Sequence, residues 1–424
     1  MAVLRFPFHL EGASWREAFP ICLEVDWSEA MGLWRASEAL DLWGAQLFEV
    51  RPQGQEAIPL QFLPGPSFHP RQRIQGEWSF VLPAQPETKD ARRFVLEVRT
   101  FPAQRALTVS PGLLRPALPN GEVAPRPYPF LMQVEPQAGG GLAFYRGKDL
   151  LLGYQYLPEW RLKPFFYPVV GPAGVGLTRL GHPHDIVGHR HHLSLWVAHQ
   201  NINSINFWEE GEGKGRQVQQ AILRLEDGPV YAEAAISLQW QRPDGVPLLA
   251  ETRIVRVYSL PQREWLMDWV LEFRALEKEV SFGKTPFGPL GVRVAKPISV
   301  LDGNGRIENA RGQVNEAQVF WQAAEWCDYS GLVEEGTWNG ITVYDHPENF
   351  SYPTHWHVRN DGWMGAALFL TQGRTLKADE GLKIRFRFYL HWGDARNPVV
   401  AHHFEVWALP PQVRWGQPQR LEEG

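Results

Sequence analysis

Apolar and polar residues alternate along most of the chain. Between residues 382 and 390 every second position is apolar, namely Leu382, Ile384, Phe386, Phe388 and Leu390. Because successive side chains of a strand point to opposite faces, this spacing predicts a half-buried antiparallel strand. Residues 94–98 and 236–240 share the pattern, and Arg242-Pro-Asp-Gly245 is a turn signal. Only residues 28–43 carry a loose helical stripe, so the pattern predicts an all-β fold with one helix there.

Prolines concentrate in one stretch and indicate where the chain divides. Residues 101–129 contain seven prolines and an Asn-Gly pair, which disfavour strand pairing and are typical of a linker. We therefore predict a β-sandwich-like accessory domain over residues 1–125 and a larger domain over residues 126–415. About 290 residues are too many for one seven-stranded sandwich but suit a many-stranded double sheet.

Charge and composition exclude several classes of protein. The net charge is −5, and no stripe of Lys or Arg provides the electrostatic footprint of nucleic-acid binding. Two cysteines form no disulfide framework. The first ten residues lack the features of a secretory signal, and no apolar stretch approaches the ~20 residues that span a bilayer. We expect a soluble, cytoplasmic protein without nucleic-acid or membrane partners. The sequence does not determine its oligomeric state.

Histidines cluster in two segments. Of 14, six lie between residues 182 and 199 and four between residues 346 and 391. If residues 189–196 form a strand, His189 and His191 share one face and His192 points to the other. If the two segments meet in one cleft, imidazoles with an ordinary pKa near ~6.5 can act as acid and base at neutral pH. Alternatively, they are hydrogen-bonded partners within an aromatic core.

His189 and His191 are also candidate metal ligands. Two imidazoles on one strand face can chelate a divalent ion, and acidic partners are available at Asp185, Asp328 and Asp345. The spacing defines no third ligand. The predicted chemistry therefore requires no cofactor, and a divalent metal ion is an additional hypothesis.

Several short blocks occur in an order found in a known family. They are Lys163-Pro-Phe-Phe-Tyr-Pro-Val-Val-Gly-Pro172, the histidine-rich run 189–198 with Phe207-Trp208, Trp326-Cys-Asp-Tyr-Ser-Gly331, Asp345-His-Pro347, Pro353-Thr-His-Trp-His-Val-Arg359 and His391-Trp-Gly-Asp394. Over residues 130 to 410 the chain thereby resembles the bacterial PmoA-like family, which carries the label "methane oxygenase PmoA".

The resemblance implies a fold and a metabolic context rather than methane oxidation. A methane monooxygenase subunit crosses the membrane with several helices, and this chain has no segment of that kind. What the resemblance implies is a soluble all-β protein that accompanies sugar dehydrogenases and isomerases. The expected fold is a large antiparallel β-supersandwich of the galactose-mutarotase type, preceded by a small β-sandwich domain.

The resemblance also implies site residues. Matching positions are His189, His191, His192, Trp196, Trp208, Asp328, Asp345, His346, His357 and Arg359. We assign His191 and His357 as the proton-transferring pair, supported by His192, and His189 as a metal ligand or an orienting residue. Arg359 would hold a carboxylate or a developing enolate.

The remaining matches would bind substrate. Trp196, Trp208 and Trp356 would stack against it, and Asp328, Asp345 and His346 would contact it. The chain departs from the family pattern at Leu193, where arginine is expected, and at Lys284-Thr-Pro-Phe-Gly288, where relatives carry an acidic residue.

These residues lead to three functional hypotheses. The first is a carbohydrate-processing enzyme, a lyase, hydrolase or epimerase, that acts on a glycoside, uronate or oxidised sugar by histidine acid–base chemistry. The second is a non-catalytic carbohydrate-binding or scaffold protein. The third is a metal-dependent oxygenase that uses the histidine cluster.

Overall fold

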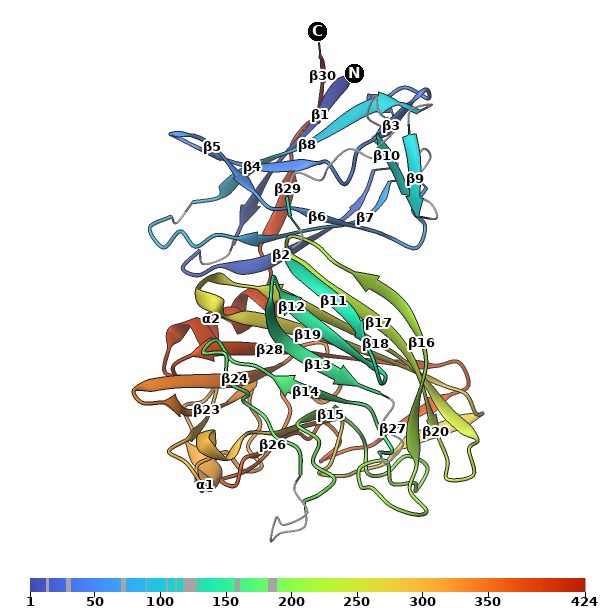
Figure 1. Cartoon of the computed structure of the whole chain (residues 1–424), viewed down its shortest axis with the longest axis vertical. Helices are drawn as coiled ribbons and strands as arrows, with labels where there is room; N and C mark the ends of the chain where they lie inside the picture. Colours follow the sequence, from blue (N-terminus) through green and yellow to red (C-terminus); the bar gives the residue numbers. More distant parts are fainter. Residues whose placement is uncertain are drawn as a thin grey trace. The chain divides into compact units, whose positions relative to one another are not determined.

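The fold is that of a computed structural model of the chain (Figure 1). The structure describes residues 1–12, 15–27, 32–69, 74–88, 90–103, 106–110, 113–116, 128–129, 131–156, 161–181 and 189–423, with backbone alone for 106–110 and 113–116. It divides into two compact units. The first comprises Met1–Leu131, Gly228–Val230 and Glu405–Gly424, and the second Met132–Asp227 and Tyr231–Phe404.

The first unit is a small β-sandwich. One sheet has the order β29-β1-β8-β4-β5, with β3 on β8 and β30 on β1, and the other has the order β2-β7-β6. Their strands are β1 (Ala2–Glu11), β2 (Phe19–Asp26), β3 (Glu38–Leu40), β4 (Gln46–Arg51), β5 (Gly54–Ile58), β6 (Gln61–Pro64), β7 (Gln75–Leu82), β8 (Arg92–Pro102), β29 (Gln412–Trp415) and β30 (Gln419–Glu422). Alternate residues of both sheets, such as Phe6 and Ile21, share one apolar core.

Three local predictions differ from this structure. The predicted helix over residues 28–43 is wrong in its described part, because Glu38–Leu40 pairs with β8 as β3. The predicted linker contains a hairpin of β9 (Ala106–Ser110) and β10 (Leu113–Pro116), and residues 117–127 lie outside the described part. Strand β29, predicted to end the large domain, pairs with β1 in the first unit.

The second unit contains two eight-stranded antiparallel sheets. The first has the order β11 (Met132–Gln137), β12 (Gly141–Arg146), β13 (Asp149–Gln155), β14 (Phe165–Val169), β15 (Leu195–Val197), β21 (Leu290–Arg293), β26 (Trp363–Ala366) and β25 (Trp356–Arg359). The second has the order β16 (Arg216–Glu226), β17 (Tyr231–Gln241), β18 (Pro247–Ser259), β19 (Trp265–Ala275), β28 (Gly381–Trp392), β24 (Thr337–Asp345), β23 (Trp326–Glu334) and β22 (Arg306–Asn309). The fold is therefore all-β, with a supersandwich as the larger unit.

Shorter elements complete the second unit. Strands β20 (Glu279–Phe282) and β27 (Arg374–Lys377) form a separate pair, and α1 (Asn315–Val319) follows β22. Helix α2 (Pro398–Ala408) follows β28, and its residues from Glu405 onward are assigned to the first unit. No helix within the described ranges is both long and apolar enough to cross a membrane.

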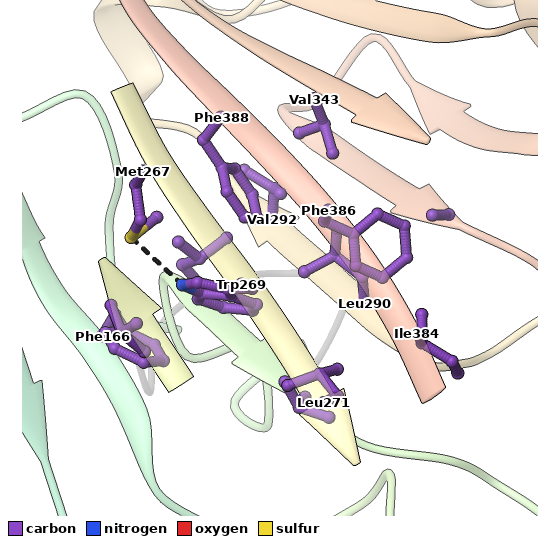
Figure 2. Close-up of a cluster of buried hydrophobic side chains, with 14 of the residues drawn as sticks. Phe166, Met267, Trp269, Leu271, Leu290, Val292, Val343, Ile384, Phe386 and Phe388 are labelled. Atoms are coloured by element: carbon purple, nitrogen blue, oxygen red, sulfur yellow. Dashed lines mark hydrogen bonds between the residues drawn. The ribbon is translucent and has the colours of Figure 1, made fainter. Parts of the chain in front are cut away.

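One apolar core joins the two large sheets. Figure 2 shows Phe166 and Leu290 of the first sheet in the same buried cluster as Trp269 and Phe386 of the second. All five apolar positions predicted from the 382–390 alternation lie in this core. The second half of that strand differs from the prediction, because Arg387, Tyr389 and His391 on its other face are buried as well.

Candidate functional site

Four strands at one end of the first sheet present a polar and aromatic face away from the core. Trp196 of β15 pairs with Gly291 of β21, Gly291 pairs with Gly365 of β26, and Gly365 pairs with His357 of β25. Their immediate neighbours along the strands, such as Val292 and Val358, point into the core. The alternation of each strand thus aligns these four residues in one row across the outer face.

Two glycines in this row make room for indole rings. A Cβ atom at Gly291 would lie 2.5 Å from the ring of Trp196, and one at Gly365 would lie 2.5 Å from the ring of Trp363. Real Cβ atoms do not approach other atoms this closely. Glycine at both positions therefore lets two tryptophans lie across the sheet.

A cavity of about 640 Å³ opens on this face. Its described lining includes four histidines, three aromatic side chains and four charged side chains. The histidines are His189, His191, His192 and His357, which belong to both histidine-rich segments of the sequence. Residues more than 160 positions apart are thus brought to one site by the pairing of β15, β21, β26 and β25.

The three neighbouring histidines form a turn rather than the predicted strand. The amide of His192 donates a hydrogen bond to the carbonyl of His189 (3.1 Å). The rings of His189 and His192 stack with centroids 4.5 Å apart, and His191 meets His192 edge-on at 4.7 Å. The prediction that His192 points away from its neighbours is therefore wrong. The turn places all three imidazoles on one side of the chain.

Trp363 connects the two histidine segments. Its ring lies 4.9 Å from that of His192 and 5.7 Å from that of His357, measured between centroids. His357 also lies against Trp321 at 4.4 Å and Phe287 at 5.2 Å. Phe287 belongs to the segment 284–288, where the resemblance predicts an acidic residue, and in this chain its aromatic ring lines the cavity.

Burial keeps these imidazoles uncharged. It lowers the pKa of His191 to about 4, an effect that nearby Lys163 reinforces, and lowers the pKa of His357 to about 4, with a contribution from Arg359. It also lowers the pKa of His192 well below its usual value. Contrary to the predicted value near ~6.5, the three side chains are neutral at pH 7 and can accept protons.

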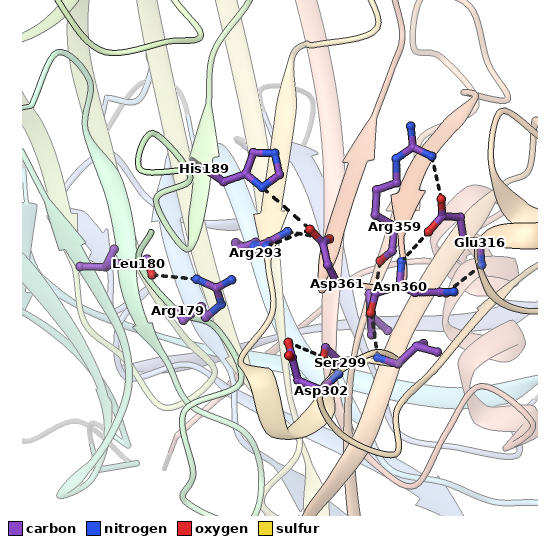
Figure 3. Close-up of polar contacts among 12 residues, drawn as sticks. Arg179, Leu180, His189, Arg293, Ser299, Asp302, Glu316, Arg359, Asn360 and Asp361 are labelled. Carbon is purple, nitrogen blue, oxygen red and sulfur yellow. Dashed lines mark hydrogen bonds and ion pairs between the residues drawn. The ribbon is translucent and has the colours of Figure 1, made fainter. Parts of the chain in front are cut away.

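Each of the three described carboxylates that line the cavity is paired with a cation. Glu316 Oε1 accepts a hydrogen bond from Arg359 Nη1 at 2.7 Å, and Asp361 accepts two from the buried guanidinium of Arg293 at 2.8 and 3.1 Å (Figure 3). Glu209 Oε2 accepts a hydrogen bond from Lys214 (2.7 Å), which lowers the pKa of this carboxyl group.

His189 lies beside one of these pairs. Its Nδ1 atom is 3.8 Å from Asp361 Oδ2 (Figure 3). This distance is too long for a hydrogen bond. At this separation the negative charge of Asp361 can still orient the His189 ring by electrostatic attraction. This geometry favours the orienting role among those predicted for His189.

The metal hypothesis has no further support from the geometry. Among the described residues, no three His, Cys, Asp or Glu side chains are arranged to hold a metal ion. Asp185, a candidate partner, lies outside the described residues. Metal binding by His189 and His191 stays a prediction.

The three tryptophans predicted to stack on substrate, Trp196, Trp208 and Trp356, are all almost fully buried. Trp196 is fully buried beneath the cavity, where its ring packs against His192 and Trp208 at 5.2 and 5.3 Å. Trp356 points into the core between the sheets, and its Nε1 donates to the carbonyl of Ala324. Trp356 faces the core because its neighbour His357 takes the outward position on β25, whereas Trp196 is on the outer face but is covered by His192, Trp208 and Trp363. Trp208 does line the cavity, but it is only 1% exposed and belongs to the same buried cluster as Trp196.

Asp328, Asp345 and His346, predicted to contact substrate, do not line the cavity. They lie on or directly after β23 and β24 of the other sheet. Asp328 Oδ2 is 2.8 Å from Nε2 of the fully buried His391 and accepts a hydrogen bond from Thr342. These contacts are those of a polar layer beside α2 rather than of the site.

Asp345 and His346 support local structure. Asp345 accepts hydrogen bonds from the Asn349 side chain and the Thr354 amide, and burial raises its pKa to about 7. Nδ1 of His346 accepts a hydrogen bond from the amide of Glu348. Both residues therefore fix the turn that follows β24.

Several lining residues were missed from the sequence. Trp363 and Asp361 stand out only once the pairing of β25 and β26 is known, and Glu316 reaches the cavity from α1. A usable signal was the run Arg359-Asn-Asp-Gly-Trp363, where Asn-Asp-Gly predicts a tight turn that would bring Trp363 back beside Arg359. In the structure Trp363 is indeed paired with Arg359.

His199 belongs to the histidine-rich segment 182–199 of the sequence, and its burial leads to a prediction about how the stability of the fold depends on pH. It is fully buried between Phe282 and Phe369, and burial lowers its pKa to about 3. The unfolded chain therefore binds a proton at this position from about pH 6.5 downward, whereas the folded chain does not. Stability is retained above pH 6.5 and declines as the pH falls toward 3.

We expect His199→Asn, whose Oδ1 can replace Nδ1 as acceptor for the Asn201 amide, to flatten this decline. The measurement is the free energy of unfolding between pH 4 and 6.5. The variant will be less stable at neutral pH, since it leaves a cavity, but its slope will be smaller. His9→Asn, at a half-exposed position, serves as control. An unchanged slope in His199→Asn would contradict the assignment.

Fold and site together define a class: an all-β protein with a supersandwich and a histidine-rich aromatic cavity on its outer face. The chain belongs to the family of unknown function DUF6807, whose sequence profile matches residues 142–405. No curated protein matches the sequence.

Two solved structures are similar at a distance. One is a protein in the glycosyl hydrolase family 38 from Enterococcus faecalis, with 10% identity and a TM-score of 0.45 over 97% of this chain and 47% of that one. The other is an alpha-mannosidase from Enterococcus faecalis V583, with 10% identity and a TM-score of 0.43 over 97% and 46%. The chain spans about half the length of each. These values do not bear on the activity of this chain.

Proposed function

We propose that this chain is a carbohydrate-processing enzyme that transfers protons with uncharged histidines. The observation that carries the proposal is the convergence of four histidines and three aromatic rings on one cavity. Its volume of about 640 Å³ lies within the range of small-molecule sites. Of the three lining rings, Phe287 is partly exposed and offers a stacking surface to an apolar face of a sugar ring, whereas Trp208 and Trp363 are almost fully buried.

The residues have distinct roles in this proposal. His191 accepts a proton from the substrate, and His357, which lines the same cavity, exchanges another. His189 is oriented by Asp361, and His192 supports the stack between His189 and Trp363. Arg359 holds a substrate oxygen, because only its Nη1 is bonded to Glu316 among the described residues.

The pH profile provides a direct prediction. Because the pKa values of His191 and His357 are lowered to about 4, kcat/KM should stay level from neutral pH to roughly pH 5 and fall as the pH approaches 4. The measurement is turnover of any sugar found active in a panel of glycosides, uronates and oxidised sugars. A fall centred near the ordinary imidazole pKa would contradict the assignment of these bases.

A non-catalytic carbohydrate-binding protein is the second candidate. The stacked, charge-compensated lining would also suit simple recognition of a glycan. Binding without turnover across the sugar panel would favour it. The relation to the PmoA-like family and the metal-dependent oxygenase stay predictions, and the latter requires a redox metal in the purified protein.

A further inference from the structure

The carboxylates of the cavity restrict the chemistry it can perform. Hydrolysis of a glycoside ordinarily uses two carboxyl groups, one of which gives a proton to the leaving oxygen. Glu316 has both oxygens engaged, Oε1 by Arg359 and Oε2 by the amide of Asn360 at 2.9 Å. Both oxygens of Asp361 are held by Arg293. Within the described lining, these two carboxylates are unsuited to proton donation.

The third carboxylate is no better placed. Glu209 is held by Lys214, which favours its charged form. Phe287, in the segment 284–288 where the resemblance predicts an acidic residue, packs against His357. The described lining therefore lacks the free acid that would protonate a glycosidic oxygen.

Proton acceptors, by contrast, are available. His191 is half-buried, lines the cavity and has no hydrogen bond to either ring nitrogen among the described residues. A neutral imidazole in this state has a lone pair to accept a proton. Because the imidazole of His191 is a weak base, the bond that gives up its proton must be activated. A C–H bond next to a carbonyl group is activated, since the negative charge left on carbon moves to the carbonyl oxygen.

Arg359 can receive that charge. Its guanidinium lies 4.1 Å from the centroid of the Phe320 ring, which fixes its plane, and its Nη1 atom is bonded to Glu316. The Nε and Nη2 donors have no partner among the described residues. They can donate hydrogen bonds to a carbonyl oxygen that becomes an enolate, and stabilisation of a developing oxyanion is a major catalytic term.

Charge pairing selects against an anionic substrate. Arg359 and Arg293 are each matched by a carboxylate, and so is Lys214. Among the described residues, the lining thus has no excess positive charge to compensate the carboxylate of a uronate. A neutral ligand satisfies the site better.

We infer that the substrate is a neutral keto-sugar and that catalysis begins with removal of the proton from the carbon beside its carbonyl group by His191. This inference rests on the proposed function and narrows it to one substrate class. The C–H electron pair becomes the C=C bond of the enolate, the carbonyl π pair moves to oxygen facing Arg359, and the proton goes to His191. The enolate then either regains a proton at carbon or expels a β-alkoxy group, which takes that proton. Neither route needs an oxidant or reductant.

The test is hydrogen–deuterium exchange. The full chain is incubated in D₂O near neutral pD with the 2-, 3- and 4-keto methyl pyranosides of glucose, galactose and mannose, and loss of the proton beside the carbonyl is followed by NMR. We expect enzyme-dependent exchange on at least one compound. The rate should fall roughly 100-fold or more in His191→Gln. His357→Gln is a second variant in case the first does not fold.

Parallel reactions separate this inference from the proposed function. Glucuronate and galacturonate methyl glycosides test the anionic alternative, and p-nitrophenyl glycosides test hydrolysis. Hydrolysis of a glycoside, or exchange on a uronate alone, would overturn the keto-sugar assignment but support a carbohydrate-processing enzyme. Absence of any reaction across the three groups would overturn both.

Discussion

Replacing His191 by glutamine should abolish turnover while the melting temperature changes by only a few degrees. Glutamine is polar and of similar length, but it cannot accept a proton at neutral pH. Loss of a general base typically lowers kcat by ~10²–10⁴-fold. The ring of His191 makes an edge contact with His192 but no hydrogen bond among the described residues, so little stability depends on it. The measurements are kcat on the best sugar of the panel and a thermal melt.

His346→Gln is a matched control. His346 is also shielded from solvent and its pKa is likewise lowered to about 4, but it does not line the cavity. We expect its kcat to match that of the unchanged protein. If kcat fell equally in both variants, the effect of His191→Gln would be due to a disturbed fold rather than to the loss of a base. An unchanged kcat in His191→Gln would remove His191 from the mechanism.

The all-β fold was accessible from the sequence because alternation reports directly on strands. Strand β28 illustrates both the power and the limit of this signal. The positions from Leu382 to Leu390 reach the core as predicted, but burial of Arg387 and His391 on the opposite face could not be predicted. Alternation identifies two faces of a strand, whereas only tertiary packing decides whether the second face is covered.

The same limit of the alternation signal explains why the site could be predicted only in part. His357 and Trp356 are adjacent, so one had to face the core, and local spacing does not say which. The cavity takes the imidazole and the core takes the indole. At His189 to His192 a turn replaces the predicted strand, and a turn of this kind leaves no period-2 signal. Glu316 was not found, because it reaches the cavity from α1 through contacts distant in sequence.

A large loss of stability is expected when a charged pair inside the core of the second unit is broken. Glu251 and Arg253 lie two positions apart on β18, on the same face as the core residues Leu249 and Val255, and both side chains are fully buried. Arg253 Nε donates to Glu251 Oε1 at 2.7 Å, and Trp240 Nε1 donates to Glu251 Oε2 at 2.7 Å. The pair must therefore satisfy its charges without water.

Arg253→Met should lower the free energy of unfolding by about 3–5 kcal/mol. The substitution leaves the Glu251 carboxylate buried with the indole of Trp240 but without its cation. The measurement is guanidinium-induced unfolding followed by tryptophan fluorescence. Arg274→Met is the matched control, since Arg274 pairs with Asp379 on the surface, where the side chains are 54% and 85% exposed. An exposed pair contributes at most about 1 kcal/mol.

The double variant Glu251→Gln with Arg253→Met distinguishes lost charge compensation from lost packing. Glutamine keeps an acceptor for the Trp240 indole but carries no charge. If the uncompensated carboxylate causes the loss, the double variant will be more stable than Arg253→Met alone, because removing the second charge removes the penalty. If the cavity left by the arginine causes it, the double variant will be equally or less stable. That outcome would show that packing of the arginine side chain, rather than the ion pair, stabilises this part of the core.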